Sequence, residues 1–158
     1  MKKTTSYILF TALLFISCTG HPDINPEYKL DTSKPISSRI VIFVSPTSDE
    51  IKKMKAKTKD LEGFYAAADD YMFYKAEATS FLKSKKIPYK LTQEKKIKFI
   101  VRKKVIEMDY SKSERDWFVL IYNGKDKPVE TYSIDINEDE TLLKQLTEPT
   151  STPTPLPH

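Results

Sequence analysis

Two adjacent carboxylates, Asp69 and Asp70, are the side chains of this sequence most suggestive of chemistry, because they interrupt an apolar and aromatic stretch from Phe64 to Tyr74. Acids in such a setting are costly unless something uses them. Adjacent residues of a helix point about 100° apart, so the pair cannot hold one ion together. A metal or glycosidase site would need a partner from another element, such as Glu107 or Asp109. The structural alternative is that one acid accepts a hydrogen bond from a tyrosine or a backbone amide and fixes how the helix docks.

The rest of the composition excludes several chemistries. The only histidines, His21 and His158, lie near the two ends of the sequence, so the body between them has no imidazole for base catalysis or for a zinc site. The three glycines are isolated, which excludes glycine-rich phosphate loops and dinucleotide fingerprints. We therefore expect no catalytic residue, no metal site and no cofactor.

The single cysteine, Cys18, ends an N-terminal segment that has the features of an export signal. A pair of lysines precedes an apolar run from Tyr7 to Ile16, which is too short to span a bilayer. The residues Phe15-Ile16-Ser17-Cys18 stand as a lipobox. Ordinary cleavage one or two residues later is the alternative, but an exported protein rarely keeps one unpaired thiol. We therefore expect acylation of Cys18 and a membrane anchor.

Four regions follow from this assignment. Residues 1–17 form the signal peptide, and residues 18–38, which lack apolar periodicity, form an extended tether from the lipid. Residues 39–146 form one domain with a modest core. Residues 147–158 contain four prolines and form a disordered Pro/Thr-rich tail.

The elements that must position these groups begin with an unbroken apolar run. Arg39 to Ser45 predicts a strand that is buried on both faces. Thr47 and Glu50 have the spacing of a capping box, so a helix begins there, and we expect a break near Leu61 to Gly63. The helix that follows, to about Lys85, has its apolar stripe at positions that recur every three or four residues: Tyr65, Ala68, Met72, Ala76, Thr79 and Leu82.

The second half of the domain has the shorter period of strands. Ile87 to Leu91 predicts one short strand, and the residues from Ile97 to Asp109 predict either a hairpin or one long bent strand. A further hairpin is predicted from Trp117 to Ile134 with Asn123-Gly124 at its turn. A short helix over Glu138 to Leu146 is predicted to complete the domain. The predicted fold class is α+β, with a long helical stretch packed on one mostly antiparallel sheet of about five strands.

Positive charge is concentrated in one part of the sequence. Residues 83–104 contain ten Lys or Arg and one acid, whereas residues 105–146 contain five basic and ten acidic residues. An exported protein with such a run meets anionic head groups or acidic proteins rather than nucleic acid. The alternative is a solvated sheet edge whose lysines prevent strand pairing. The candidate binding residues are Lys95, Lys96, Lys98, Arg102, Lys103 and Lys104.

Short motifs give the chain a resemblance to a known group. The lipobox signal, a Ser-Pro after the first strand, the Phe64 to Tyr74 pattern and a Trp-led strand into Asn-Gly resemble those of small lipoproteins of Bacteroidetes-type bacteria. The resemblance spans most of the mature chain and implies no activity.

Three functions are compatible with these observations. The first is a monomeric, lipid-anchored protein of the bacterial cell envelope, on the outer membrane or the periplasmic face, that acts by binding as an inhibitor or immunity-type protein against an envelope-active toxin or hydrolase. The second is a structural or assembly lipoprotein whose basic segment contacts anionic lipid. The third is an enzyme that uses the carboxylate of Asp69, Asp70 or Glu77.

Overall fold

A computed structural model describes residues 24–132 of the chain. The predicted signal peptide with Cys18, the helix predicted over Glu138 to Leu146 and the Pro/Thr-rich tail lie outside the described residues. The elements follow in the order η1 (Pro26–Tyr28), β1 (Ile40–Val44), α1 (Ser48–Lys57), α2 (Leu61–Ser84), β2 (Tyr89–Thr92), β3 (Lys96–Val101), β4 (Lys104–Asp109), β5 (Phe118–Tyr122) and β6 (Val129–Thr131).

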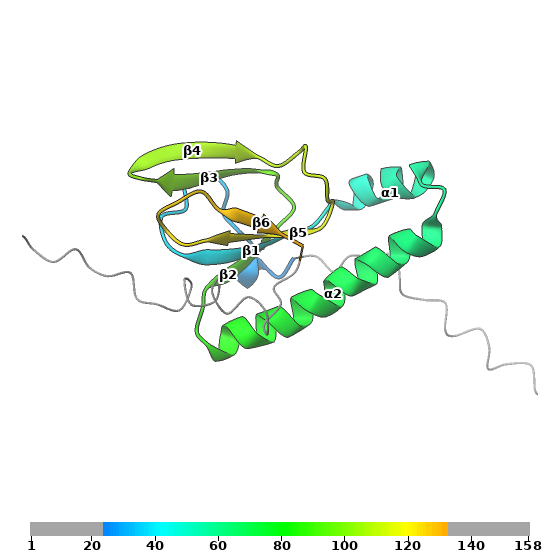
Figure 1. The fold of residues 1–158 in the computed structure, drawn as a ribbon, viewed down its shortest axis with the longest axis horizontal. Helices are drawn as coiled ribbons and strands as arrows, with labels where there is room; N and C mark the ends of the chain where they lie inside the picture. The colour runs from blue at the N-terminus through cyan, green and yellow to red at the C-terminus, as the bar shows by residue number, and fades with distance from the viewer. Residues whose placement is uncertain (1–23, 133–158) are drawn as a thin grey trace, which may run out of the picture.

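The described strands form two sheets, so the predicted fold class with one sheet of about five strands is wrong. The main sheet has the order β2-β1-β5-β6, and β3 pairs only with β4 in a separate two-stranded sheet. The main sheet is mixed. β2 is parallel to β1, because α1 and α2 bring the chain back to the end of the sheet where β1 begins. β5 is antiparallel to β1, and β6 is antiparallel to β5. Figure 1 shows the β3–β4 hairpin on one side of the main sheet and α2 on the other.

The hairpin covers the main sheet because its side chains alternate. Ile97, Phe99 and Val101 of β3 are buried, and the two residues between them, Lys98 and Ile100, are half-buried. This single apolar face packs against Ile42 and Leu120 in the middle of the main sheet. β1 and β5 are buried along their whole length and need cover on both faces. The sequence predicted this double burial for β1 but not the second layer that provides it.

The other face of the main sheet packs against α2, on a different stripe from the one predicted. Tyr71, Ala78 and Leu82 are the buried residues of α2, while Tyr65 is 44% exposed. The buried stripe is rotated around the helix relative to the predicted stripe. Lys75 lies on the same face of the helix as Tyr71, Ala78 and Leu82. Of the six residues of the predicted stripe, only Leu82 is among the buried residues of α2.

The helical region begins and breaks at capping residues. The predicted capping box at the start of α1 is confirmed: Glu50 N–H donates to the Thr47 hydroxyl at 3.2 Å, and Thr47 N–H donates to the Glu50 carboxylate at 2.7 Å. The break lies at residues 58–60, slightly before the predicted position, because Asp60 caps α2 by accepting from Gly63 N–H at 2.8 Å. A Cβ at Gly63 would approach Asp60 Oδ2 to 2.3 Å, so a larger residue there would require the Asp60 carboxylate to shift.

The turn with two consecutive positive φ angles, which the sequence predicted at Asn123-Gly124, lies instead between β3 and β4. β3 and β4 form a hairpin through a two-residue turn in which Arg102 and Lys103 have φ angles of 51° and 67°. The predicted Asn123-Gly124 turn has only one positive φ, 85° at Gly124. The Asn123 side chain instead accepts hydrogen bonds from Lys125 N–H and Asp126 N–H at 2.9 and 3.0 Å. The connection between β5 and β6 therefore extends over residues 123–128.

Residues 24–38, which we expected to belong to the tether, lie along the edges of both sheets. Leu30 is buried, and its N–H donates to the carbonyl of Leu91 in β2 at 2.9 Å. Ile36 N–H donates to Lys98 O at 2.9 Å and its carbonyl accepts from Ile100 N–H at 2.8 Å. Contacts with the domain therefore begin well before Arg39.

Candidate anion-binding surface

The β3–β4 turn is held beside the β5–β6 connection by contacts between the two sheets. The Tyr122 hydroxyl at the end of β5 donates a hydrogen bond to Ile100 O in β3, and its ring centroid lies 5.0 Å from that of Phe99. Arg102 N–H donates to Lys125 O at 3.2 Å, and the Arg102 guanidinium lies 3.4 Å from the Asp126 carboxylate. Figure 1 shows both connections at the end of the molecule opposite α1.

Three of the six predicted basic residues are paired with acids of α1 or β4, in addition to the pair between Arg102 and Asp126. Lys95 Nζ lies 3.5 Å from the Glu50 carboxylate, and the Lys95 side chain is only 16% exposed. The ammonium groups of Lys96 and Lys98 lie 3.8 and 4.0 Å from the carboxylates directly opposite them on β4, those of Asp109 and Glu107.

The pKa of Asp109 reflects this setting. Hydrogen bonds from Ser111 hold the pKa of the Asp109 carboxyl below its usual value, and Lys96 and Lys112 lower it further. The acids that follow in the sequence thus face the basic run across the hairpin. The separation of charge along the chain is not a separation in space at these positions.

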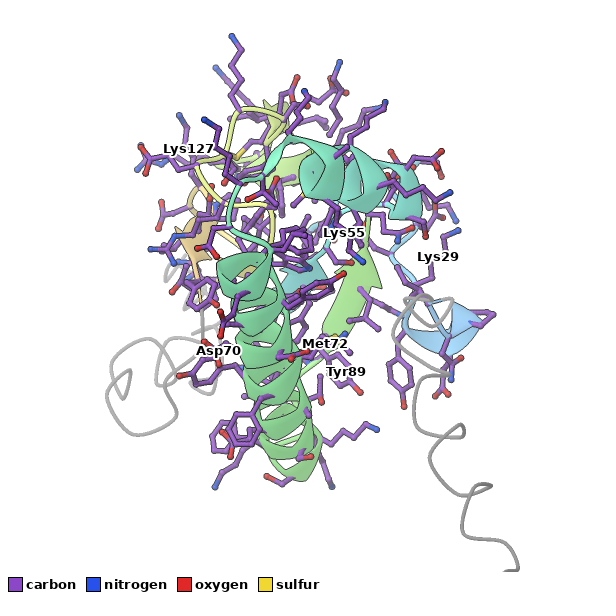
Figure 2. The ribbon with its side chains drawn as sticks, turned by 90° about the vertical axis from the view of Figure 1, so that its right-hand side faces the viewer. Lys29, Lys55, Asp70, Met72, Tyr89 and Lys127 are labelled. Carbon is purple, nitrogen blue, oxygen red and sulfur yellow. The ribbon has the colours of Figure 1, made fainter. Side chains whose placement is uncertain are left out.

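The other predicted basic residues gather at the turn, where they meet cations from the second connection. Arg102, Lys103 and Lys104 are exposed, as are Lys125 and Lys127. We call these five residues together with Asp126 the basic end; its six side chains carry five positive charges and one negative charge. Figure 2 labels Lys127, and Figure 1 places the β5–β6 connection beside the β3–β4 turn. Such a cluster raises the local concentration of anions.

The basic end is hollowed rather than flat. An open cavity of about 630 Å³ has apolar walls from Val101 and Ile106, with the cations Arg102, Lys104 and Lys127 around it. A second cavity, of about 390 Å³, lies on the side of Gly124 and Lys125. Cations around an apolar recess suit an anionic group attached to an apolar body.

Asp69 and Asp70 are not in this surface. Both are exposed on α2, so neither has the burial that would make an acid costly at these positions. The docking role considered for them belongs to a tyrosine of the same segment: the Tyr71 hydroxyl donates to Val44 O at 3.0 Å. Asp70 acts on Tyr132 instead, whose pKa is raised by burial and then by the charge of Asp70. Within residues 24–132, no group of three or more His, Cys, Asp or Glu side chains is placed to hold a metal ion.

Lys125 and Lys127 are the candidate binding residues that the sequence did not single out. They lie outside the basic run and inside the net acidic half of the chain. The sequence signal that could have identified them is the presence of basic residues at the turns of both predicted hairpins. The position of one hairpin against the other depends on the contact of Tyr122 with Ile100. Nothing in the local sequence specifies that contact.

No family model, no curated protein and no solved structure matches the chain. The arguments for function therefore come from the geometry of the described residues and from the N-terminal sequence. In that described part, neither helix combines the length and the hydropathy needed to cross a membrane.

Proposed function

We propose that this chain is a lipid-anchored protein of the bacterial envelope that acts by binding, and that its basic end contacts the phosphate groups of anionic lipids. The observation that carries the proposal is the meeting of five cations from two separate connections, three of which, Arg102, Lys104 and Lys127, line an apolar recess. Each Lys or Arg close to an anionic membrane contributes about 1 kcal/mol, so the cluster is worth several kcal/mol at low salt. We assign no catalytic role to the exposed pair Asp69 and Asp70.

A short link to the proposed lipid strengthens this contact. Cys18 precedes Ile24, the first described residue, by six positions. An extended chain covers at most about 3.6 Å per residue, so the link spans no more than about 22 Å. Anchoring makes the contact with head groups intramolecular, and its effective concentration then lies in the millimolar range. A contact that is weak in solution would be occupied on the membrane.

Binding to a protein partner, as an inhibitor or immunity-type protein, is the second proposal. A cavity at the other end of the main sheet favours it, since that cavity is acidic and aromatic rather than basic. A third possibility is that the basic end binds an acidic protein rather than lipid. The vesicle experiment described next distinguishes these two ligands.

Vesicle binding tests the first proposal. Full chains that carry Cys18→Ser are mixed with phosphatidylcholine vesicles or with vesicles that also contain phosphatidylglycerol. Changing Arg102, Lys103 and Lys104 to Gln should weaken binding to the anionic vesicles about 100-fold, which corresponds to roughly 3 kcal/mol for three charges. The matched control changes Lys53, Lys57 and Lys59, exposed cations around the end of α1, to Gln and should have little effect. Equal losses in both triple variants, or no preference for anionic vesicles, would show that the basic end does not bind lipid.

The anchor is tested separately in cells. Cys18→Ser should abolish incorporation of labelled fatty acid and release the protein from the membrane fraction at high salt. A variant that stays in that fraction would place the anchor elsewhere.

A further inference from the structure

The end of the main sheet opposite the basic end carries an open cavity of about 490 Å³. It is formed by the connection between α1 and α2, the first turns of α2, the segment before β5 and Tyr132 after β6. The segment before β5 lies beside the end of β1, because Phe118 pairs with Val44. Ligands of sheets with parallel strands often bind at such carboxyl ends, beyond the last residue of the strand. In Figure 1 this is the end from which β1 leads into α1.

Negative charge predominates around this cavity. Asp60, Glu114 and Asp116 lie in its walls, and Arg115 is the only basic residue among the wall residues. The Asp60 carboxylate is already engaged by Gly63 N–H at the start of α2. Glu114 and Asp116 are exposed and available to a ligand. The charge of this end is thus opposite to that of the basic end.

Aromatic rings form much of the remaining wall. Phe64 and Trp117 lie with ring centroids 5.4 Å apart, and Tyr132 completes the wall. The guanidinium carbon of Arg115 lies 4.8 Å from the centre of the Tyr132 ring. The face of this ring therefore already accepts a cation from the chain itself, in a setting where carboxylates strengthen the attraction.

Trp117 adds an unused hydrogen-bond donor. Its side chain belongs to the cavity wall, the residue is only 6% exposed, and its Nε1 has no hydrogen-bond partner among the described residues. A buried donor without an acceptor is unfavourable by about 1 to 3 kcal/mol. Nε1 is closed to solvent in this structure, so an acceptor supplied by a ligand would remove that penalty once the ring turns enough to open Nε1 to the cavity.

We propose that this cavity binds a lysine or arginine residue presented by a peptide segment of a partner protein. Its ammonium or guanidinium group lies against the aromatic wall between Glu114 and Asp116, and a backbone carbonyl beside it accepts from Trp117 Nε1. The inference goes beyond the contact with lipid, because the cavity lies at the other end of the sheet. An anionic or neutral ligand would leave the carboxylates without a partner.

The chain contains one tryptophan, so the emission of Trp117 reports on this cavity directly. The full chain in non-ionic detergent is titrated with three blocked tripeptides in which the central residue is Lys, Arg or Gln between alanines. The Lys and Arg peptides should shift the emission and saturate, with affinity about tenfold higher than that of the Gln peptide. Equal affinity for all three, or the absence of a shift, would overturn the proposal.

Three variants, compared by calorimetry, identify the contacts. Glu114→Gln with Asp116→Asn should weaken the Lys peptide about tenfold, and Trp117→Phe should weaken it without loss of thermal stability. Arg115→Gln should strengthen binding, because it removes the resident cation from Tyr132. Weaker binding by Arg115→Gln would instead show that the cavity selects anions. The control, Glu107→Gln, removes an exposed acid on β4 and should leave the affinity unchanged.

The outcome is separable from the vesicle experiment. Neutralising Arg102, Lys103 and Lys104 should leave the peptide affinity unchanged, and the Glu114/Asp116 variant should bind anionic vesicles as the parent does. Binding by free lysine amide as tightly as by the Lys peptide would overturn the part of the proposal that requires a peptide.

Discussion

The hydroxyl of Tyr71 donates a hydrogen bond to the backbone carbonyl of Val44 at 3.0 Å, which ties the middle of α2 to the last residue of β1. Both residues are almost fully buried, and burial raises the pKa of the Tyr71 phenol, which therefore stays protonated as a donor. The contact sets the rotation of the long helix on the sheet. It explains why Tyr71 rather than Tyr65 faces the core.

Removal of this hydrogen bond should cost stability with little change in shape. We expect Tyr71→Phe to lower the free energy of unfolding by about 1 to 2 kcal/mol, because the Val44 carbonyl loses a partner inside the core. Chemical denaturation measures the difference. Tyr74→Phe, at a 41% exposed position on the same helix, is the matched control and should stay within about 0.5 kcal/mol of the parent. Similar losses in both variants would argue against a special role for Tyr71.

The capping box of α1 predicts a dependence of stability on acid pH. Partial burial tends to raise the pKa of Glu50, but hydrogen bonds from Thr47 and the charge of Lys95 outweigh it, and the net pKa is lowered from 4.5. An acid with a lowered pKa in the folded state stabilises the fold above its unfolded pKa. That contribution is lost as pH falls below about 4.5 and through the lower folded value.

Glu50→Gln should therefore flatten the fall in stability below about pH 4.5. At neutral pH the loss should stay below about 1 kcal/mol, since glutamine also completes a capping box and the pair with Lys95 is partly exposed. Urea melts at several pH values measure the slope. A variant with the slope of the parent would show that the Glu50 contacts do not hold in solution.

Lys75 predicts a gain in stability on substitution. It lies in line with the buried residues of α2, and burial lowers its pKa from 10.5. A base with a lowered pKa in the folded state costs stability while it is charged in both states; the cost decreases as the pH rises above the folded pKa and is gone above the unfolded pKa of 10.5. Lys75→Met should raise the free energy of unfolding at neutral pH by about 1 kcal/mol.

The gain from Lys75→Met should shrink as the pH approaches 10.5, and denaturation at neutral and alkaline pH measures this trend. The interaction of the Lys75 ammonium with the Tyr71 ring, 5.7 Å away, limits the gain. Lys53→Met on the exposed face of α1 should give no comparable gain. A loss of stability by Lys75→Met would show that this interaction outweighs desolvation.

Local chemistry in the sequence predicted β1 and the start of α1, but not the buried stripe of α2 or the form of the Asn123-Gly124 turn. The double burial of β1 and the capping box at Thr47 follow from residues within a few positions of each other. The layer formed by β3 and β4 did not follow, because an alternating strand such as β3 can either extend a sheet or cover one. The choice depends on contacts between distant residues, such as Tyr122 with Ile100.

The same limit applies to the site. The sequence identified Arg102, Lys103 and Lys104 as candidate binding residues, and the structure places them together at one end. It could not show that Lys96 and Lys98 face acids on the neighbouring strand, since the alternatives of hairpin and bent strand remained open. Lys125 joins the site only through the packing of one hairpin against the other.

The β3–β4 turn allows stability and binding to be separated. Arg102 and Lys103 both have positive φ angles, a conformation that costs an ordinary residue about 1 to 2 kcal/mol and that Asn-Gly adopts readily. Changing Arg102 to Asn and Lys103 to Gly should raise the free energy of unfolding by about 1 kcal/mol, after allowance for the lost ion pair with Asp126. The same variant should bind anionic vesicles about 30-fold more weakly, because two charges are removed. Lys104→Gln, outside the turn, should weaken binding without a gain in stability. If the double variant is more stable but binds as the parent does, the strained basic turn is not part of the lipid contact. If it is more stable and binds more weakly, the turn keeps its cations for binding at a cost in stability.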